Sequence, residues 1–529
     1  MESYDIIIIG GGSAGSAAAG RLSEDPKLSV CLIEAGGSND NWRIKTPGML
    51  AMLPDDANWK YDTVPQAHLN GRIGYQPRGR GLGGSSAVNA MLYVRGNPWD
   101  YDNWAALGAT GWGWDDVLPY FKRSEHNERG GDALHGDSGP LNVMDQHYAN
   151  PVSLAFVEAA AELQLPRNND FNGAEQAGFG LYQVTQKGGE RWSAARAYVN
   201  PAQKRPNLDV KTGALVERII VTDGRATGVQ IIRDGVSKTL HARAAVILSA
   251  GAFGSPQILQ LSGFGPADHL QSVGVEVLAN RAAIGSDLQD HCDYILGYDT
   301  ESRVPIGQSL GGLMSLAGAV IRHRINRTGP MTTPYAESGG FWSIRPDAPA
   351  PDVQYHFVPA VLEDHGRETI KAHGFSVHTC VLRPESRGTV RLASNNAATA
   401  PLIDPNFLDD DRDIALMRDG VRLCQRICEA PALQAFGPTD RHPVNYDNDA
   451  ELDAMIRARA DTIYHPVGTC RMGNDADAVV DAELRFNGVK GLYVADASIM
   501  PRLVSGNTNA PSIMIGERCA DFVKAHLRS

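Results

Sequence analysis

Three glycines and one glutamate near the N-terminus have the types and spacing that bind a dinucleotide. Gly10, Gly12 and Gly15 fit the pattern G-x-G-x-x-G within the segment YDIIIIGGGSAGSAAAG. Glycines at these places allow a tight turn, let a pyrophosphate approach the backbone, and pack a helix closely on a strand. Glu34 follows Gly15 by nineteen residues and can accept hydrogen bonds from a ribose 2′-hydroxyl. The pattern predicts FAD or NAD, unphosphorylated at that ribose, with a glycine-rich structural turn as the alternative.

A strand, a helix and a second strand are expected to position these residues. Residues 6–9 are four isoleucines without polar alternation, which is typical of a strand buried on both faces of a parallel sheet. The small residues that follow would begin a helix whose N-terminus faces the phosphates. A second apolar run over residues 28–33 ends at Glu34. This order predicts the first part of a nucleotide-binding α/β domain.

A second glycine-rich segment, residues 78–96, reads RGRGLGGSSAVNAMLYVRG. Glycines bring backbone N–H groups close to a ligand, and a helix that begins after such a loop favours an anion. The segment therefore predicts a second contact with the cofactor, and a surface linker is the alternative interpretation.

Length and composition limit the class of protein. A chain of 529 residues is expected to form roughly two domains. Its apolar content of 43% and charged content of 21% are those of an ordinary globular protein. The formal net charge is −12, and Lys and Arg are dispersed, which argues against a nucleic-acid partner and against strong attraction to anionic lipid.

The N-terminus and the cysteines indicate a cytoplasmic protein. MESYD carries acids and no basic region, so it does not resemble a secretory signal. The apolar stretch over residues 309–321 is shorter than the roughly 20 residues that span a membrane, which leaves only peripheral membrane contact open. Seven scattered cysteines do not form a disulfide framework. Cys424 and Cys428 lie four apart on an expected helix, and we interpret them as buried packing rather than metal ligands, so no metal site is predicted.

Several segments together resemble the glucose–methanol–choline (GMC) oxidoreductase family, a group of FAD enzymes. GRGLGGSSAVNAMLYVRG is similar to the family's first signature, and GAFGSPQILQLSGFG at residues 251–265 is similar to its second, with Phe264 in place of the usual aliphatic residue. The resemblance continues in the family's order through essentially the whole chain. Further similar pieces are GSDLQDH (285–291), RPESRGTVRL (383–392), YHPVGTCRMG (464–473), VADASIMP, and SGNTNAPSIMIGE, which ends at Glu517.

The resemblance implies an interleaved α/β architecture. A Rossmann-like FAD-binding domain would comprise residues 1–150, 203–296 and 451–529. A substrate domain, built on an antiparallel sheet flanked by helices, would comprise residues 151–202 and 297–450. Local patterns agree in outline, with strand-like runs at 208–211, 214–222, 226–233 and 244–248, and strand candidates at 351–359 and 374–382.

The resemblance also implies which residues hold FAD. Asp496 ends an expected strand at 491–496 and is assigned to the flavin's ribityl and pyrophosphate region, with capping of the next helix as its alternative role. Some family members attach FAD through a histidine before Asn89, but Val88 stands there and has no nucleophile, so dissociable FAD is expected. The expected cofactor residues are Gly10, Gly12, Ser13, Ala14, Gly15, Glu34, Ala35, Arg80, Gly83, Gly84, Ser85, Asn89, Ala90, Val216, Ala250, Gly251, Asp496, Ala497, Thr508 and Asn509.

His465 and Asn507 are the expected catalytic pair, because the resemblance places them at the reactive edge of the flavin. An alcohol carbon gives up hydride readily only as its hydroxyl proton leaves. His465 would take that proton as a neutral base, and the Asn507 amide would donate a hydrogen bond to the developing alkoxide. Ile463 and Tyr464 are the candidates for the substrate pocket. FAD would supply the electron chemistry at N5.

Several activities remain open within this resemblance. The sequences of residues 382–392 and 462–473 resemble dehydrogenases of primary aliphatic or aromatic alcohols, which would pass electrons to a quinone or carrier. An oxidase that uses O₂ is the alternative. Choline would need an aromatic cage, for which Tyr464, Trp59, Trp342 and Glu337 are available. A lyase or decarboxylase of the same family, a non-enzymatic flavoprotein and a nicotinamide enzyme are more remote alternatives.

Overall fold

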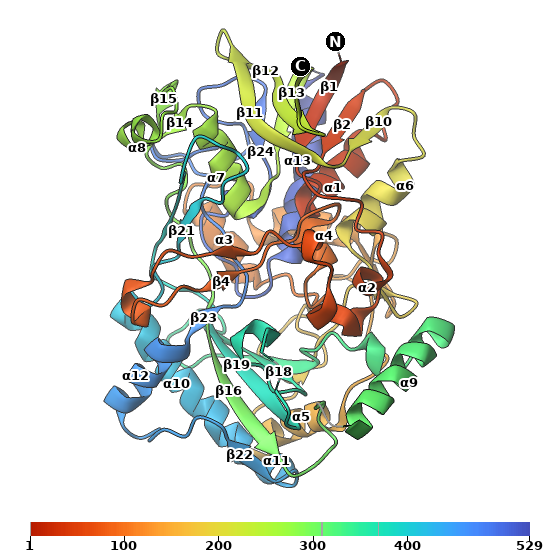
Figure 1. Ribbon diagram of the computed structural model, residues 1–529, viewed down its shortest axis with the longest axis vertical. Coiled ribbons are helices and arrows are strands. Elements are labelled where there is room, and N and C mark those ends of the chain that lie inside the picture. The colour runs from red at the N-terminus through yellow and green to blue at the C-terminus, as the bar shows by residue number, and fades with distance from the viewer. Residues whose placement is uncertain (1, 308–309, 369, 529) are drawn as a thin grey trace.

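Two sheets form the framework of the protein (Figure 1). The computed structural model describes residues 2–307, 310–368 and 370–528. Within these residues each of the two sheets has seven strands, and shorter two-stranded sheets lie around them. In Figure 1 the first sheet lies in the upper part with both chain ends, and the second lies in the lower part. This arrangement confirms the mixed α/β class expected from the sequence.

The first sheet is parallel in the part whose strand ends lead into the loops of the candidate site. Its pairing places β1 between β2 and β13, with β10 beyond β2 and β24 beyond β13. Ile9 pairs with Ile33 and Leu248, so the residues after these three strands meet at one edge of the sheet. The parallel strands are β1 (Glu2–Ile9), β2 (Val30–Ile33), β10 (Leu208–Lys211), β13 (Val236–Leu248) and β24 (Leu492–Val494), and the antiparallel extension is β11 (Ala214–Thr222) and β12 (Arg225–Arg233).

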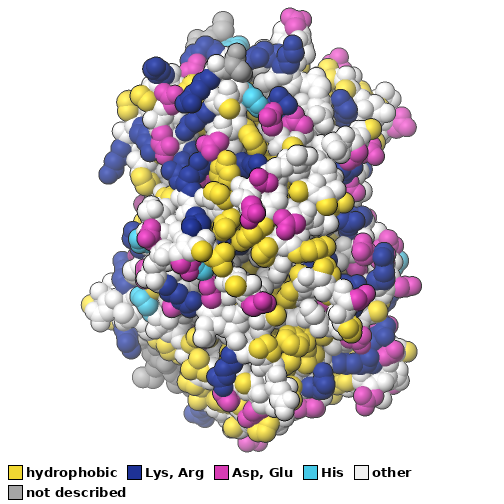
Figure 2. All heavy atoms as spheres, turned by 180° about the vertical axis from the view of Figure 1, so that it is seen from behind, with side chains coloured by type: hydrophobic (Ala, Val, Ile, Leu, Met, Phe, Trp, Pro, Cys, Tyr) yellow, Lys and Arg dark blue, Asp and Glu magenta, His cyan; other side chains and the backbone are white. Residues whose placement is uncertain are grey.

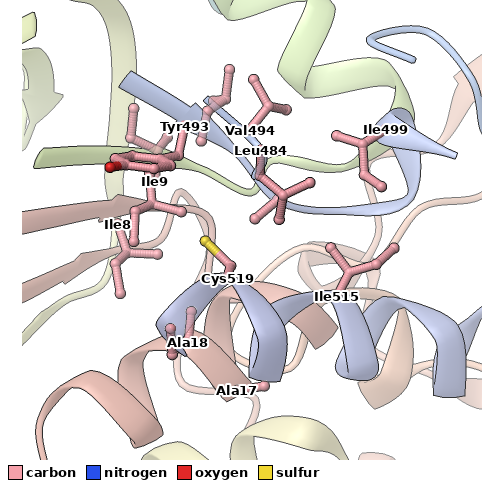
Figure 3. Packing of buried hydrophobic residues seen from close by; sticks show 14 of the residues in the cluster. Ile8, Ile9, Ala17, Ala18, Leu484, Tyr493, Val494, Ile499, Ile515 and Cys519 are labelled. Atoms are coloured by element: carbon pink, nitrogen blue, oxygen red, sulfur yellow. The ribbon is translucent and has the colours of Figure 1, made fainter. Parts of the chain in front are cut away.

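Two helices from opposite ends of the chain pack together on this sheet. Helix α1 (Ser13–Leu22) follows the first glycine turn, and α13 (Asn509–His526) ends the chain. Small side chains let them approach closely, since a Cβ at Gly516 would overlap the backbone of Ala14. Figure 3 shows the core between these helices and strands β1 and β24, and its labelled side chains are Ile8, Ile9, Ala17, Ala18, Leu484, Tyr493, Val494, Ile499, Ile515 and Cys519.

The second sheet is antiparallel and separates two environments. Tyr355 and Phe357 point to one face, where Tyr355 donates to the Gly420 carbonyl of α10 and Phe357 stacks on Phe156 of α5. The alternate residues of the same strand point to the opposite face, toward the first sheet's loops. The strands are β22 (Pro438–Asp440), β16 (Cys292–Thr300), β19 (Gly374–Val381), β18 (Val353–Val358), β17 (Ser338–Trp342) and β7 (Gly178–Leu181), with β23 (Asp461–Thr462) also paired to β16, and the helices behind are α5 (Pro151–Glu162) and α10 (Asp411–Cys428).

Two strands of the second sheet lie partly or wholly in residue ranges that the sequence assigned to the cofactor domain. Strand β16 belongs to the second sheet along its whole length, so the chain enters that sheet at residue 292 and not after 296. Strand β23 also belongs to the second sheet, although residues 451–529 were assigned to the cofactor domain. Both differences arise because residues 292 and 462 pair with each other beside the candidate catalytic histidine.

The remaining elements connect and cover the two sheets. Cys424 and Cys428 are buried on α10, and no metal-binding cluster of His, Cys, Asp and Glu occurs in the part of the chain that the structure describes. The other helices are α2 (Trp42–Lys45), α3 (Pro98–Ala106), α4 (Trp114–Ser124), α6 (Asn200–Ala202), α7 (Gly251–Leu261), α8 (Ala267–Ser272), α9 (Leu310–Asn326), α11 (Pro431–Gln434) and α12 (Asp449–Arg459). The short strands are β3 (Tyr61–Asp62), β4 (Tyr75–Gln76), β5 (Glu125–Asn127), β6 (Leu141–Val143), β8 (Gln186–Lys187), β9 (Glu190–Arg191), β14 (Phe264–Gly265), β15 (Ala279–Asn280), β20 (Thr389–Arg391) and β21 (Leu402–Asp404).

The surface of the molecule carries charges of both signs. Acidic and basic side chains are interspersed over most of its back (Figure 2). Of the apolar stretch over residues 309–321, residue 309 lies outside the described residues, and the rest belongs to α9. No described helix is both long and apolar enough to cross a bilayer.

Candidate cofactor cradle and active site

The first glycine turn has two closed positions and one open position. A Cβ at Gly15 would overlap the Gly10 carbonyl, and Gly10 itself has φ +96° and faces the Ser249 backbone. Gly12 differs, because it has an ordinary φ of −72° and a Cβ added there would meet no described atom within 4 Å. The fold therefore requires glycine at positions 10 and 15, whereas position 12 leaves bare backbone facing open space, as a bound pyrophosphate requires.

Glu34 connects the two glycine-rich segments. Its carboxylate accepts backbone N–H bonds from Gly11, Gly36 and Gly81, each at 2.9 Å. A carboxylate has about four acceptor positions, so one remains for a ribose hydroxyl. Besides the predicted ribose contact, Glu34 thus has a structural role that the sequence pattern did not indicate.

The second glycine-rich segment lies directly against the first turn. At Gly84, which has φ +49°, a Cβ would lie 2.7 Å from Cα of Gly12. Asn89 Oδ1 accepts from the Met91 N–H at 3.0 Å and from Arg191 Nη1 at 2.9 Å. Arg191 is fully buried, so a charged side chain distant in sequence fixes this segment. The arrangement fits a cofactor-binding loop better than a surface linker.

Two helix N-termini meet at the same place. The Ser13 hydroxyl at the start of α1 donates to Asn509 Oδ1 at the start of α13, at 2.7 Å. Converging N-termini favour an anion through their free N–H groups and their dipoles. The cradle therefore has the donors and the open position that a dinucleotide pyrophosphate needs.

Asp496 performs the capping role that the sequence left as an alternative. It accepts from the Ser498 N–H at 2.8 Å and caps the short helix at residues 497–499. It also accepts from the Gly251 N–H at 2.8 Å and from Ser255 Oγ, which fixes the start of α7. Val216, another expected cofactor residue, lies within β11. The remaining ones lie in loops or at helix starts, namely Ala14, Ala35, Arg80, Gly83, Ser85, Ala90, Ala250, Ala497 and Thr508.

His465 lies in a chain of hydrogen bonds that fixes its tautomer from one side. His291 Nε2 is 3.0 Å from the Leu382 carbonyl, which can only accept, so Nε2 carries the hydrogen of neutral His291. His291 Nδ1 is then an acceptor, and it lies 3.0 Å from His465 Nδ1. His465 must therefore donate from Nδ1, which leaves the lone pair on Nε2.

The hydrogen bonds on the other side of His465 indicate the same tautomer of its ring. The Tyr182 hydroxyl donates to the Tyr355 carbonyl at 2.6 Å, so its oxygen accepts from Gln354 Nε2 at 3.2 Å. Gln354 Nε2 also donates to Asn507 Oδ1 at 3.2 Å. Asn507 therefore presents its NH₂ group to His465 Nε2 at 3.1 Å. An alcohol hydroxyl that approaches both groups can replace this direct bond, because it can donate to Nε2 and accept from Nδ2.

Burial keeps the ring of His465 neutral. Desolvation lowers the pKa of His465 well below its usual value, and the nearby His291 and His356 lower it further. Burial likewise lowers the pKa of His291 to about 3 and that of His356 well below its usual value. A neutral imidazole with its lone pair on Nε2 is the form that can accept a proton, once an alcohol hydroxyl takes the place of the Asn507 N–H there.

Asp290 supports the backbone of His465. Its carboxylate accepts from the His465 N–H at 2.8 Å and from Thr462 Oγ1 at 2.6 Å. Burial raises the pKa of Asp290 to about 7, in spite of these bonds and of the nearby Arg78. Arg78 in turn donates to the carbonyl of Tyr464, which has the unusual φ of +75° for a side-chain-bearing residue. These contacts hold His465 at a strained turn.

The two expected pocket residues occupy one apolar cluster beside this site. Ile463 is buried and Tyr464 is packed with it against Met91, Leu92 and neighbouring side chains. The Tyr464 hydroxyl is 2.7 Å from His365 Nδ1.

The four residues considered for a choline cage do not come together. Glu337 is enclosed by bonds from the Asn150 N–H, Ser153 and Thr333. Trp342 packs in the cluster behind the second sheet, and Trp59 stacks on Tyr61. These contacts give Glu337, Trp342 and Trp59 structural roles.

Sequence reasoning missed the residues that orient His465. Asp290 and His291 lie inside the segment GSDLQDH, which was matched to a family without any role for its side chains. Gln354 and His356 alternate on the site face of β18, and His378 pairs with His356 across the ladder. An alternation of polar residues within a buried strand was the available signal, but it does not reveal which strand faces the histidine.

Comparisons with known proteins give matches over nearly the whole chain. The N-terminal model of the GMC oxidoreductase family matches residues 4–293, and its C-terminal model matches residues 384–516. The chain is 44% identical to an alcohol dehydrogenase (acceptor) from Pseudomonas putida, over 98% of this chain and 95% of the relative. It is 43% identical to an oxygen-dependent choline dehydrogenase from Rhizobium johnstonii over the same shares.

Solved structures show the same fold. A pyridoxine 4-oxidase from Mesorbium loti superposes with a TM-score of 0.88 at 32% identity, over 99% of both chains. A formate oxidase from Aspergillus oryzae, whose FAD modification has been studied, superposes with a TM-score of 0.92 at 26% identity, over 100% of this chain and 99% of that one.

Proposed function

Because this chain belongs to the GMC family of FAD-dependent oxidoreductases acting on CH–OH donors, as its motifs predicted, we propose that it oxidises a primary alcohol to the aldehyde. The single observation that carries the proposal is the chain of hydrogen bonds that leaves a lone pair on His465 Nε2 beside an amide N–H of Asn507. An aliphatic or aromatic alcohol is the substrate class, and the apolar cluster that contains Ile463 supports this choice.

FAD is the proposed cofactor, held without a covalent bond. The glycine turn at Gly12 and the N-termini of α1 and α13 would bind its pyrophosphate, and Glu34 would bind its ribose. When bound, FAD accepts the hydride of the alcohol. Val88 offers no nucleophile for attachment. Acid precipitation should release the yellow colour into the supernatant, and colour that stays with the protein pellet would contradict this proposal.

His465 acts as the base in this proposal. Its neutral ring receives the hydroxyl proton at Nε2, and the resulting imidazolium keeps its Nδ1–H bond to His291. Asn507 donates to the alcohol oxygen as negative charge develops there. Gln354 holds the Asn507 amide in the donating orientation from the other side. Neither amide changes its protonation, so both serve to orient the alcohol.

We propose a dehydrogenase that passes electrons to a quinone or carrier, in line with the alcohol dehydrogenase (acceptor) relative. An oxidase that uses O₂ is the second candidate, because the pyridoxine 4-oxidase shares the fold at 32% identity. Choline is a weaker candidate as substrate. A choline dehydrogenase is a close relative, but Trp59, Trp342 and Glu337 do not form a cage here.

An anaerobic titration of the purified yellow protein tests the proposal. Benzyl alcohol, a medium-chain alkanol and choline are added separately, and the visible flavin band is followed before and after air is admitted. Bleaching by the first two with slow recovery in air is the expected result. Rapid recovery with peroxide would identify an oxidase, and bleaching by choline alone would identify a choline enzyme. No bleaching by any of them would contradict the proposed function.

A further inference from the structure

Helix α9 lies at the edge of the molecule (Figure 1), and two of its isoleucines are exposed. Ile321 is 60% exposed and Ile325 is 73% exposed, and they lie one turn apart on the helix. His323 points to the opposite side, where it is buried and its Nε2 lies 2.8 Å from the Gly189 carbonyl. The helix is thus anchored by its inner side and presents isoleucines outward.

A neighbouring segment extends this apolar surface. The guanidinium of Arg324 lies 5.3 Å from the ring centre of Trp42, which joins α9 to α2. Arg43 of α2 in turn donates to the Met52 carbonyl at 3.5 Å. Trp42 and Met52 are exposed as well, by 42% and 56%. We call Trp42, Met52, Ile321 and Ile325, with Arg43, Arg322 and Arg324 among them, the α9 surface.

The segment that contributes α9 to this surface has a charge opposite in sign to that of the whole chain, and two acids that flank the Trp42 and Met52 part, Asp40 and Asp55, are paired with Lys45 and Lys60. Residues 302–336 contain no Asp or Glu and four arginines, although the chain has a formal net charge of −12. Arg322 and Arg324 are exposed, and Arg43 borders Trp42. A basic face beside exposed large apolar side chains is typical of a helix that lies in the interface of an anionic bilayer.

We propose that the α9 surface docks this protein on the surface of a membrane that contains anionic lipid. The isoleucines and Trp42 would enter the boundary between headgroups and acyl chains, and the arginines would contact the phosphates. This docking is peripheral and does not rest on the proposed alcohol chemistry. The acidic remainder of the chain would be repelled by the same membrane, so only this face is presented.

Short segments connect the α9 surface to the apolar cluster beside His465. The short helix at residues 330–332 contacts α9 and the helix at residues 47–52, which ends at Met52. Tyr335 follows it, donates to the Gly48 carbonyl at 2.9 Å, and belongs to the apolar cluster that contains Ile463 and Tyr464. Docking through α9 would therefore place that cluster on the side of the molecule that faces the lipid.

Flotation of the flavin-loaded full-length protein with vesicles tests the proposal. The vesicles consist of phosphatidylcholine alone or of phosphatidylcholine with phosphatidylglycerol. We expect binding to the anionic vesicles that weakens as salt is raised. The double substitution I321S/I325S should lower the partition coefficient on anionic vesicles by about tenfold or more, because two exposed apolar side chains are lost. R322Q should lower it by roughly fivefold on anionic vesicles and leave binding to neutral vesicles unchanged.

A matched control uses an equally exposed side chain elsewhere. Val236 is 53% exposed at the start of β13, whose hairpin with β12 lies at the far end of the molecule from α9 (Figure 1), so V236S should bind like the wild type. An unchanged visible flavin spectrum shows that each variant is folded. Equal binding of I321S/I325S and wild type would overturn the proposal, as would failure of the wild type to bind anionic vesicles. Conversion of a dimer to a monomer by I321S/I325S, without vesicle binding by either form, would overturn it as well and would assign the α9 surface to a second copy of the chain.

Discussion

The cofactor cradle and the histidine chain are built from different kinds of chemical groups. The cradle consists mostly of backbone, since Glu34 receives three N–H bonds and position 12 contributes bare Cα. The histidine chain consists mainly of side chains, with a backbone carbonyl at each end, and its central bond joins residues 174 apart in sequence. A backbone site depends on conformation that a few neighbouring residues determine, whereas a side-chain site depends on which distant segments meet. This difference determines what each substitution should do.

The largest effect is expected at Gly12, where the cradle is open. G12A should fold normally, because the residue has an ordinary φ and a Cβ meets no described atom within 4 Å. It should nevertheless lose bound flavin, and with it all alcohol oxidation, because the methyl group would occupy the approach of the pyrophosphate. The flavin content after purification and the far-UV CD spectrum measure the two parts of this prediction.

Gly15 supplies the contrast within the same turn. A Cβ there overlaps the Gly10 carbonyl, so G15A should lower the folded yield as well as the flavin content. If G12A retained stoichiometric flavin, Gly12 would be only a structural position and the proposed cradle would be wrong.

Substitution of His465 is expected to have the next largest effect. H465A should lower kcat by roughly 10²- to 10⁴-fold, because the proton acceptor is lost while the cradle is left intact. The flavin content should stay at the wild-type level, since His465 bonds to His291 and Asn507 and to no residue of the glycine turn. Steady-state turnover of a good alcohol at equal flavin concentration measures this effect, and near-normal turnover would remove His465 from the base role.

The same contrast explains how far the sequence could be interpreted. The first turn and its strands were predictable because residues 6–15 and 28–34 form one local unit with strong patterns. The register of β1, β2 and β13 then places Gly10 and Glu34 at one sheet edge without further information. The family resemblance also indicated His465 and Asn507, and in the structure His465 Nε2 lies 3.1 Å from Asn507 Nδ2.

The partners of His465 could not be predicted in this way. His291 bonds to the Leu382 carbonyl, and Gln354 is oriented through Tyr182 by the Tyr355 carbonyl. These carbonyls determine the tautomer of His465. Because every residue has a backbone carbonyl, the sequence does not show which one accepts such a hydrogen bond. The sheet membership of residues 292–296 was equally hidden, because the strand that begins at residue 292, next to His291, pairs across the second sheet.

His291 tests whether a residue without contact to the alcohol can control the base. H291F removes the acceptor for His465 Nδ1–H, so the imidazole can adopt the tautomer with its hydrogen on Nε2. We expect kcat to fall by roughly 10- to 10³-fold, with KM and flavin content nearly unchanged. H269F is a matched control, because His269 also contacts a carbonyl, that of Leu392, but lies outside the histidine chain. An equal loss of kcat in both variants would indicate a structural role for His291.

The smallest effect is expected at Asp290, and it appears in the pH profile. The pKa of Asp290 is raised to about 7 by burial, so its carboxyl becomes ionised as the pH rises through neutrality. The ionised carboxylate accepts the His465 N–H and places negative charge near the ring, which makes Nε2 a better base. We therefore expect kcat/KM to rise with pH near 7, by about fivefold for an interaction on the order of 1 kcal/mol.

D290N separates this effect from titration of His465 itself. The pKa of His465 is lowered well below its usual value, so its ring stays neutral on both sides of pH 7 and cannot cause a change in rate there. The amide oxygen introduced by D290N would still accept the His465 N–H bond, but the side chain would carry no charge, so the rise near pH 7 should disappear while flavin content is preserved. If the rise persisted in D290N at the same pH, the histidine would be titrating near neutrality. The hydrogen-bond chain from Leu382 to Tyr355 would then not hold the base in its neutral form. A side chain other than His465 would have to be considered as the base that is contrasted with the backbone cradle.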